Sequence, residues 1–243
     1  MAPPAHKAGS QRPGDEAPGR PDGHALARRP SALFRALGEI GLMTPRLWGR
    51  ASSVNVQKVM WALAELGLEH ERIDAGGTYG RIDEVRVLNP NARVPVWQED
   101  GLTLWESHAI LRHLAARGIA HDPVADQWME WTTSTLQPPF IGVFWQVVRM
   151  RRVERSAEAL ARHAEALNAA LAILDGRLAE AGWLDGRGFS TAELAAGSLM
   201  YRIHDVDWTM GDFPHVRGWY DRLAARPAYG ESVMTSYDEL RVT

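Results

Sequence analysis

The fold is decided by residues 89–110, which read NPNARVPVWQEDGLTLWESHAI. Two short runs in this stretch, Val94–Gln98 and Leu102–Trp105, flank the dipeptide Asp100-Gly101. An Asp-Gly pair between two such runs is a strong signal for a two-residue hairpin turn. A helix is expected to begin near Glu106-Ser107, because the apolar residues that follow share one helical face. The stretch therefore predicts a β-hairpin followed directly by a helix.

The sequence before the hairpin alternates between predicted strands and helices. Arg46–Arg50 and His70–Asp74 are expected to form strands, and Arg81–Leu88 a short helix. Between the two strands, apolar residues recur every three or four positions, which is typical of one helical face. These residues are Val56, Val59, Met60, Leu63 and Leu66, and Gly67 is the expected end of the helix. The order β-α-β-α-β-β-α predicts a small α/β domain over residues 43–118, with the hairpin at one edge.

The sequence after a linker at Gly118–Pro123 is expected to be helical throughout. Val124–Met150 is a long helix candidate interrupted at Pro138-Pro139, and Ser156–Ala181 is a second long helix. Ser190–Glu193 has the form of a capping box, and Pro214–Ala225 predicts a further helix. Residues 124–243 therefore predict an all-α domain.

The composition excludes several classes of protein. The 243 residues are 45% hydrophobic and 23% charged, close to globular averages, and the formal net charge is −3. That charge gives no basic excess for binding nucleic acid. Cysteine is absent, which rules out disulfides and cysteine nucleophiles, and no apolar run is long enough to predict a membrane span. The sequence predicts a cytoplasmic protein.

Residues 1–42 differ from the rest of the chain. The first 30 residues hold six of the fourteen prolines, and Leu26 is their only Leu, Ile, Val or Phe. Such a stretch buries too little apolar surface to offset its ordering entropy, so a disordered arm is expected. The alternative is an arginine-rich targeting or docking arm.

Four stretches together resemble the glutathione transferase superfamily over residues 44–230. They are Ser53-Val54-Asn55, Asn89–Pro95, Trp105–Ile110, and Phe189–Glu193 paired with Trp219–Pro227. The resemblance is greatest to subfamilies with a Ser/Thr-x-Asn pattern and without a catalytic cysteine. It implies a thioredoxin-like N-terminal domain, an all-α C-terminal domain, glutathione as co-substrate and a homodimer. Ala92 stands where the family usually has Gly, and Glu193 where it usually has Asp.

Glutathione chemistry needs a thiolate near neutral pH, whereas a free thiol has a pKa of about 8.5. Hydrogen bonds and the positive potential of a helix N-terminus lower a thiol pKa. Ser53 and Asn55 precede the first predicted helix, and each carries a side-chain donor. The resemblance implies that they activate the sulfur, with Ser53 as the main hydroxyl donor or Asn55 as the main amide donor. The alternative is that both only cap the helix.

The resemblance also implies how the tripeptide is held. Glu106 and Ser107 would bind the γ-glutamyl group at a helix N-terminus, where free N–H groups favour a carboxylate. Val94 precedes Pro95, which is a cis proline in the family, and its backbone would pair with the cysteinyl backbone. Arg93 would meet the glycyl carboxylate. Asp126 would reach the ligand of the partner subunit, as acidic groups near this place do in related chains.

Aromatic side chains of the helical half are candidates for the pocket of the second substrate. They are Trp131, Phe140, Phe144, Trp145 and Trp208. Large aromatic residues are more often part of a core than of a pocket, so this reading stays beside a purely structural one. The nine histidines show no ligand spacing, and we expect no metal site.

Two functions follow as hypotheses. The first is a glutathione S-transferase that activates the thiol for attack on a hydrophobic electrophile, or for reduction of a disulfide or peroxide. The second is a non-catalytic binding or interaction module that kept the fold. The joint presence of Ser53, Asn55, Pro95, Glu106 and Ser107 favours the enzyme.

Overall fold

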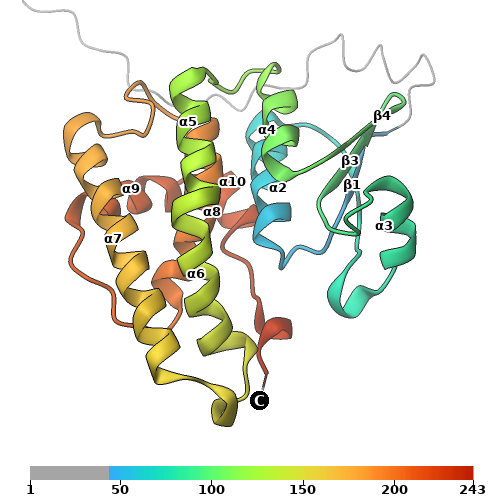
Figure 1. Cartoon of the computed structure of the whole chain (residues 1–243). Coiled ribbons are helices and arrows are strands. Elements are labelled where there is room, and N and C mark those ends of the chain that lie inside the picture. Colours follow the sequence, from blue (N-terminus) through green and yellow to red (C-terminus); the bar gives the residue numbers. More distant parts are fainter. Residues whose placement is uncertain (1–43, 243) are drawn as a thin grey trace, which may run out of the picture.

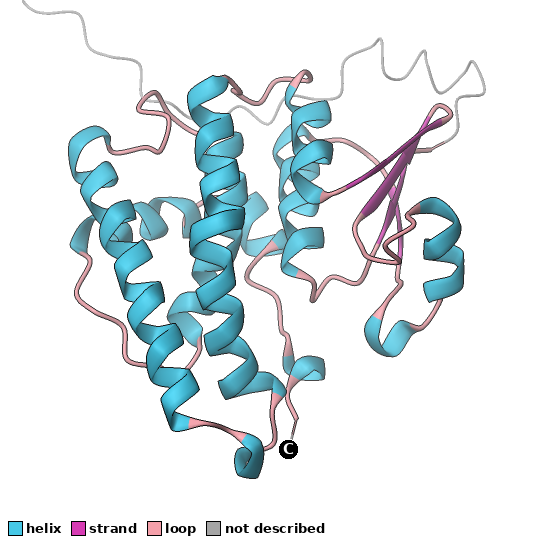
Figure 2. Cartoon of the chain, viewed as in Figure 1, coloured by secondary structure: helices cyan, strands magenta, loops and turns pink. Residues whose placement is uncertain are grey.

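A computed structural model of the chain describes residues 44–242, and the predicted arm at 1–42 lies outside the described residues. A four-stranded sheet with three helices forms one half of this part, and a group of helices forms the other (Figures 1 and 2). None of the helices in residues 44–242 has the length and apolar character needed to cross a membrane.

The sheet has the order β2-β1-β3-β4. Strand β1 (Arg46–Trp48) is parallel to β2 (Glu71–Ile73) and antiparallel to β3 (Val96–Glu99), which pairs antiparallel with β4 (Leu102–Trp105). The predicted hairpin is confirmed: Asp100 and Gly101 form its turn with φ of 46° and 81°, as a turn with two left-handed residues requires.

The two faces of the sheet are covered by different helices, because successive side chains of a strand point to opposite faces. Leu47 belongs to the main core with α2 (Val54–Leu66) and α4 (Ser107–Ala115), whereas its neighbour Trp48 packs with Val85 of α3 (Ile82–Leu88). Figure 1 shows α2 and α4 between the sheet and the helical half, and α3 on the far face of the sheet. This is the expected thioredoxin-like arrangement.

The helix predicted at Val124–Met150 is a continuous rod of several segments. These are α5 (Pro123–Trp131), the π-helical turn η2 (Thr132–Leu136), α6 (Gln137–Phe144) and the π-helical turn η3 (Trp145–Arg149). The expected interruption at Pro138-Pro139 is a change of helix type and not a break. The prolines lie in the first turn of α6, where a missing N–H removes no hydrogen bond of that helix.

The remaining helices complete the helical half. They are α7 (Ala157–Ala181), α8 (Thr191–Asp205), α9 (Pro214–Ala224) and α10 (Pro227–Ser232). Helix α8 lies at the centre, and most of its side chains are buried. The predicted capping box is present: Glu193 accepts hydrogen bonds from the N–H groups of Ser190 at 2.9 Å and Leu184 at 2.8 Å.

Helix α2 joins the two halves, since it packs on α8 and α10 as well as on α4. Its Trp61 is fully buried and stacks edge-on against Tyr229, with ring centroids 4.7 Å apart. Near the end of the helix, Glu65 accepts two hydrogen bonds from Arg226, each 2.7 Å. Helix α2 is therefore held in a fixed position beside the helical half.

Candidate active site

A cavity of 340 Å³ lies where the N-terminal ends of α2 and α4 meet the helical half. Three of the predicted site residues, Asn55, Glu106 and Ser107, line it. The other lining residues come from α2, α4, α5, η2 and α6, and they are Lys58, His108, Ala109, Arg112, Glu130, Thr133 and Gln137. The cavity thus joins two helix N-termini with a set of charged and amide side chains.

Ser53 stands at the N-cap position of α2. Its carbonyl oxygen accepts the N–H of Gln57 at 2.8 Å, but its side chain makes no capping hydrogen bond. An N-cap serine usually satisfies a free backbone N–H of the first turn. The hydroxyl of Ser53 is therefore available to another partner, at a place where free N–H groups favour an anion.

The loop that leads into α2 is held by Arg202 of α8 and by the C-terminal tail, which is the segment 233–242 after α10. Arg202 donates a 2.7 Å hydrogen bond to the carbonyl oxygen of Ser52, and Arg50 donates one of 3.1 Å to the Ser52 hydroxyl. That hydroxyl donates in turn to Glu239, whose carboxylate lies 3.8 Å from the Arg50 guanidinium. Ser53 follows directly on this cluster, so the tail fixes the start of α2.

Arg202 is almost fully buried below this loop. Its guanidinium carbon lies 4.9 Å from the ring centroid of Tyr237 and 5.5 Å from that of Phe144. Burial lowers the pKa of Arg202 to about 10, which still leaves it charged at neutral pH. The Tyr237 hydroxyl donates to Asp205, and burial raises the pKa of that hydroxyl.

The start of α4 is unusual in its backbone. Glu106 is the N-cap residue with φ of 70°, in the left-handed region that non-glycine residues seldom adopt, and its side chain makes no capping hydrogen bond. Ser107 is the first residue of the helix and is buried. Such backbone outliers cluster at ligand sites, where the surroundings hold them in place. The geometry turns the N-terminus of α4 towards the cavity.

The loop before β3 approaches the same region. The Val94–Pro95 bond is cis, as the resemblance implied. A Cβ atom at Gly49 would lie 2.4 Å from Val56 and 3.1 Å from Val94, so only glycine permits this contact between the loop and β1. Arg93 is exposed, and its carbonyl oxygen accepts a 2.8 Å hydrogen bond from Asn89.

Asp126 makes an ion pair within its own chain. Its carboxylate lies 2.7 Å from Arg112 of α4, and Arg112 also pairs with Glu130 one turn further along α5. Both carboxylates raise the pKa of Arg112, and burial acts in the opposite sense. Asp126 thus joins α5 to α4 beside the cavity without lining it.

None of the five aromatic candidates lines the cavity, and among them Phe140 and Phe144 pack together, with ring centroids 5.7 Å apart. Phe140 and Phe144 are core residues, and Trp131 is half-buried against Trp128 with ring centroids 5.0 Å apart. Trp145 is 49% exposed, and the Trp208 indole donates a 2.8 Å hydrogen bond to the Ile203 carbonyl. Their role as a wall for the second substrate stays a prediction.

Lys58 and His108 are site residues that the sequence reasoning missed. Lys58 is fully buried in α2, and its Nζ lies 3.0 Å from Gln137 Oε1 and 3.2 Å from His108 Nε2. A signal was present: Lys58 and Lys7 are the only lysines in a chain with 27 lysines and arginines combined. Because nearly every cationic side chain is arginine, the lysine at position 58 is an exception that could have pointed to the site.

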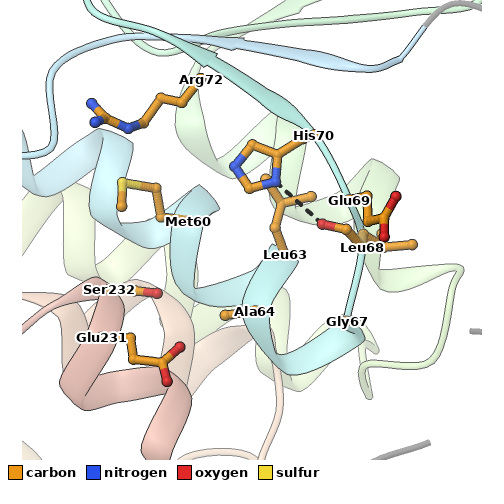
Figure 3. Close-up of a pocket in the computed structure, with 10 residues that line it drawn as sticks. All are labelled: Met60, Leu63, Ala64, Gly67, Leu68, Glu69, His70, Arg72, Glu231 and Ser232. Atoms are coloured by element: carbon orange, nitrogen blue, oxygen red, sulfur yellow. Dashed lines mark hydrogen bonds between the residues drawn. The ribbon is translucent and has the colours of Figure 1, made fainter. Parts of the chain in front are cut away.

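A second cavity of 380 Å³ lies at the other end of α2 (Figure 3). It is lined by the C-terminal turns of α2, the segment 67–72 and two residues of α10. Figure 3 shows His70 turned towards the Leu68 carbonyl, at 3.2 Å. The lining contains no predicted site residue. Within residues 44–242, no group of three or more histidine or acidic side chains is placed to hold a metal ion.

Comparison with known proteins finds matches to both halves of the chain. The model of the glutathione S-transferase N-terminal domain matches residues 52–117, and that of the C-terminal domain matches residues 124–227. The chain is 35% identical over 201 residues to glutathione S-transferase GstB of Escherichia coli strain K12, across 77% of this chain and 97% of that relative.

Glutathione S-transferase 4 of Zea mays is 30% identical over 198 residues, which cover 75% of this chain and 89% of that protein. Among solved structures, the theta class glutathione S-transferase of Xanthomonas axonopodis pv. citri with glutathione bound is 38% identical, with a TM-score of 0.76. That match covers 80% of this chain and 99% of the other. The chain belongs to the glutathione S-transferase family of enzymes.

Proposed function

We propose that the chain transfers glutathione to a small hydrophobic electrophile, with Ser53 and Asn55 activating the thiol. One observation carries the proposal: Asn55, Glu106 and Ser107 line a single cavity at two helix N-termini. The free hydroxyl of Ser53 lies at the head of the same helix as Asn55. A sulfur held there would receive a hydroxyl and an amide hydrogen bond in a positive potential, and both lower its pKa.

The tripeptide is held by the loops around this point. The γ-glutamyl carboxylate meets the N-terminus of α4 at Ser107, and the carboxylate of Glu106 meets its ammonium group. The backbone of Val94, before Pro95, pairs with the cysteinyl group, and Arg93 meets the glycyl carboxylate. This proposal places the reactive sulfur between Ser53 and the helical half.

The second substrate and the assembly complete the proposal. Trp131, Phe140, Phe144, Trp145 and Trp208 stay candidates for the apolar wall. A cytoplasmic homodimer is proposed, in which Asp126 acts near the ligand of the partner subunit. Two exposed apolar residues of the edge strand β4, Leu102 and Trp105, support a second copy covering this edge, because an uncovered sheet edge favours association.

The test replaces the two proposed donors. Ser53→Ala and Asn55→Ala should each raise the pKa of the bound glutathione thiol, read from the pH profile of the thiolate absorbance. We expect Ser53→Ala to have the larger effect. Turnover of a chlorinated nitrobenzene at neutral pH should fall roughly tenfold to a hundredfold, less than in a site closed to water, and recover in part as pH rises.

Glutathione affinity should hold in both variants, since other residues bind the tripeptide. A small glutathione mixed disulfide serves as a second substrate, and turnover of that compound alone would assign a reductase in place of a transferase. If both variants and the double variant keep the wild-type pH profile, neither residue activates the thiol.

A further inference from the structure

Lys58 carries a buried amino group without an acidic partner. It lies one helical turn after Asn55 on the same face of α2, and its side chain is 1% exposed. The two groups within hydrogen-bonding distance of its Nζ are the neutral Gln137 amide oxygen and the His108 ring. No ion pair of residues 44–242 includes it. A buried ammonium without a countercharge is costly, so the site favours the neutral amine.

The hydrogen-bond pattern fits a neutral amine. Burial is the main cause that lowers the pKa of His108 to about 2, so its ring is neutral. Nε2 then accepts from Lys58, and the Nδ1 proton is donated to the Thr133 hydroxyl 3.3 Å away. A neutral amine has two N–H donors, and Gln137 and His108 accept both. Protonation adds a third donor, for which residues 44–242 supply no acceptor.

The charges around Lys58 come from two elements, α4 and α5. On α4, Glu106 raises the pKa of Lys58, but burial outweighs it and lowers that pKa to about 7. Arg112, also on α4, is already paired with Asp126 and Glu130 of α5. The π-helical turn η2 and helix α6 contribute only neutral groups to the cavity, Thr133 and Gln137. Of Lys58 and Arg112, the lysine and the arginine of the cavity lining, Lys58 is therefore the one without a carboxylate partner.

We propose that Lys58 couples glutathione binding to proton uptake in this cavity. When the α-carboxylate of the γ-glutamyl group enters, the Lys58 amine takes a proton from solvent and becomes an ammonium ion. Its new N–H supplies the countercharge that the carboxylate needs. This proposal rests on the proposed glutathione site, and it adds a binding residue whose charge depends on the ligand.

The choice of lysine supports the coupling. An arginine keeps its charge at every accessible pH, whereas a buried lysine titrates readily. Every other lysine or arginine position in residues 44–242 holds arginine. Position 58 therefore departs from the chain's usual choice of a permanent cation. With lysine, the site without glutathione holds a neutral amine and avoids a buried unpaired charge. When glutathione binds, the protonated Lys58 forms an ion pair with its α-carboxylate.

Titration calorimetry with S-methylglutathione tests the coupling. This probe carries the α-carboxylate but has no thiol proton, so thiol ionisation does not contribute. From a pKa of about 7, roughly three quarters of Lys58 is neutral at pH 7.5, so binding in two buffers of different ionisation enthalpy should show uptake of up to that fraction of a proton. A glutathione S-methyl analogue that lacks the α-carboxylate should bind more weakly and without proton uptake.

Two variants give matched controls. Lys58→Met should lose the uptake and about tenfold in affinity, the value of one hydrogen bond to a charged group. Lys58→Arg should keep affinity and lose the uptake, because its charge is permanent. Wild-type protein that binds S-methylglutathione without proton uptake overturns the coupling and leaves the proposed function intact. Failure of S-methylglutathione to bind overturns both.

A second measurement needs no substitution. Protein labelled with ¹³C-lysine gives side-chain resonances from Lys7 and Lys58 alone. The Lys58 resonance, assigned with Lys58→Arg, should titrate near pH 7 in the free protein and at higher pH with S-methylglutathione bound. A Lys58 titration above pH 9 in the free protein, or one unmoved by saturating ligand, contradicts the proposal.

Discussion

At the scale of single residues, the backbone of the site uses conformations that side chains disfavour. Glu106 and Ala92 both have positive φ, of 70° and 52°. The two positions differ in their surroundings: Glu106 lines the cavity, whereas Ala92 lies in the turn after Asn89, whose carbonyl accepts its N–H at 2.8 Å. Strain at Glu106 thus coincides with the proposed binding site, and strain at Ala92 coincides with a turn only.

Ala92→Gly should stabilise the protein. The left-handed conformation costs a non-glycine residue about 1–2 kcal/mol. Glycine removes this cost, but part of the gain is lost because glycine gives the unfolded chain more conformational entropy. We expect the free energy of unfolding to rise by about 0.5–1 kcal/mol, measured by urea denaturation. Ala161→Gly, at an exposed position of α7, is the control and should lose about 1 kcal/mol. A loss in Ala92→Gly would show that the turn carries no strain.

Ser107→Ala tests the proposed γ-glutamyl contact. It should weaken glutathione binding by about 1–3 kcal/mol, because it removes a hydrogen-bond partner from a charged carboxylate. Affinity for the second substrate should change little. The control is Ser198→Ala, which removes a buried hydroxyl bonded to the Leu194 carbonyl of α8 and should lower stability only. Calorimetry that finds unaltered glutathione affinity in Ser107→Ala would make Ser107 a purely structural residue.

At the scale of elements, the sequence predicted what local patterns control. The Asp100-Gly101 turn and the apolar face of α2 follow from turn chemistry and helical periodicity, and both are confirmed. The partners of Lys58 could not be predicted in this way. His108 and Gln137 lie 50 and 79 residues from it in sequence, so their contacts depend on how α4 and α6 pack against α2. The residue types alone do not show which side chains distant in sequence come into contact.

The C-terminal tail shows the same limit. No motif marks Glu239, yet it accepts from Ser52 and lies beside Arg50 at the start of α2. The tail is anchored on both sides of this contact, by Gln57 donating to Thr235 at 2.9 Å and by Val242 donating to the Val148 carbonyl at 3.0 Å. The tail therefore crosses the loop before α2, and this loop positions Ser53.

Glu239→Ala should lower turnover more than binding. Loss of the carboxylate removes the acceptor of the Ser52 hydroxyl and the countercharge of Arg50, so the loop before Ser53 loses order. We expect kcat to fall severalfold and glutathione Kd to change less than twofold, because Glu106 and Ser107 lie on a different element. Asp238→Ala is the matched control, since its surface pair with Arg241 does not touch the loop. An equal fall of kcat in both variants would assign the effect to the tail as a whole.

At the scale of the whole molecule, buried ionisable groups lie both between the two halves and within the helical half. Lys58 and His108 lie between the sheet domain and the helical rod, and Glu193 lies in the capping box of the central helix. Burial raises the pKa of Glu193 to about 7, against the effect of its hydrogen bonds, and lowers that of Lys58 to about 7. The stability of the fold must therefore depend on pH well away from the usual carboxylate range.

The sign of this dependence differs between the groups. Glu193 holds its proton more tightly when folded, so its contribution to stability falls as pH rises from its ordinary range to about 7. His108 holds its proton less tightly when folded, and its contribution rises with pH up to about 6.5. These two effects oppose each other below neutral pH. Above pH 7, Lys58 is the group of this set that still differs between the folded and unfolded states.

Lys58→Met should abolish the rise in unfolding free energy with pH that Lys58 causes above neutral pH. In the wild type, the unfolded chain binds one proton more at Lys58 than the folded chain between about pH 7.5 and 9.5, so unfolding free energy should rise with pH by up to about 1.4 kcal/mol per unit from this group. Urea denaturation across that range measures the difference in slope between wild type and Lys58→Met, which cancels the groups that both share. The variant should also be more stable than the wild type at pH 6, where the wild type must bury a charge. Parallel curves for the two proteins would show that Lys58 is an ordinary lysine with its usual pKa, since only a shifted group makes the stability of a folded protein depend on pH in this range.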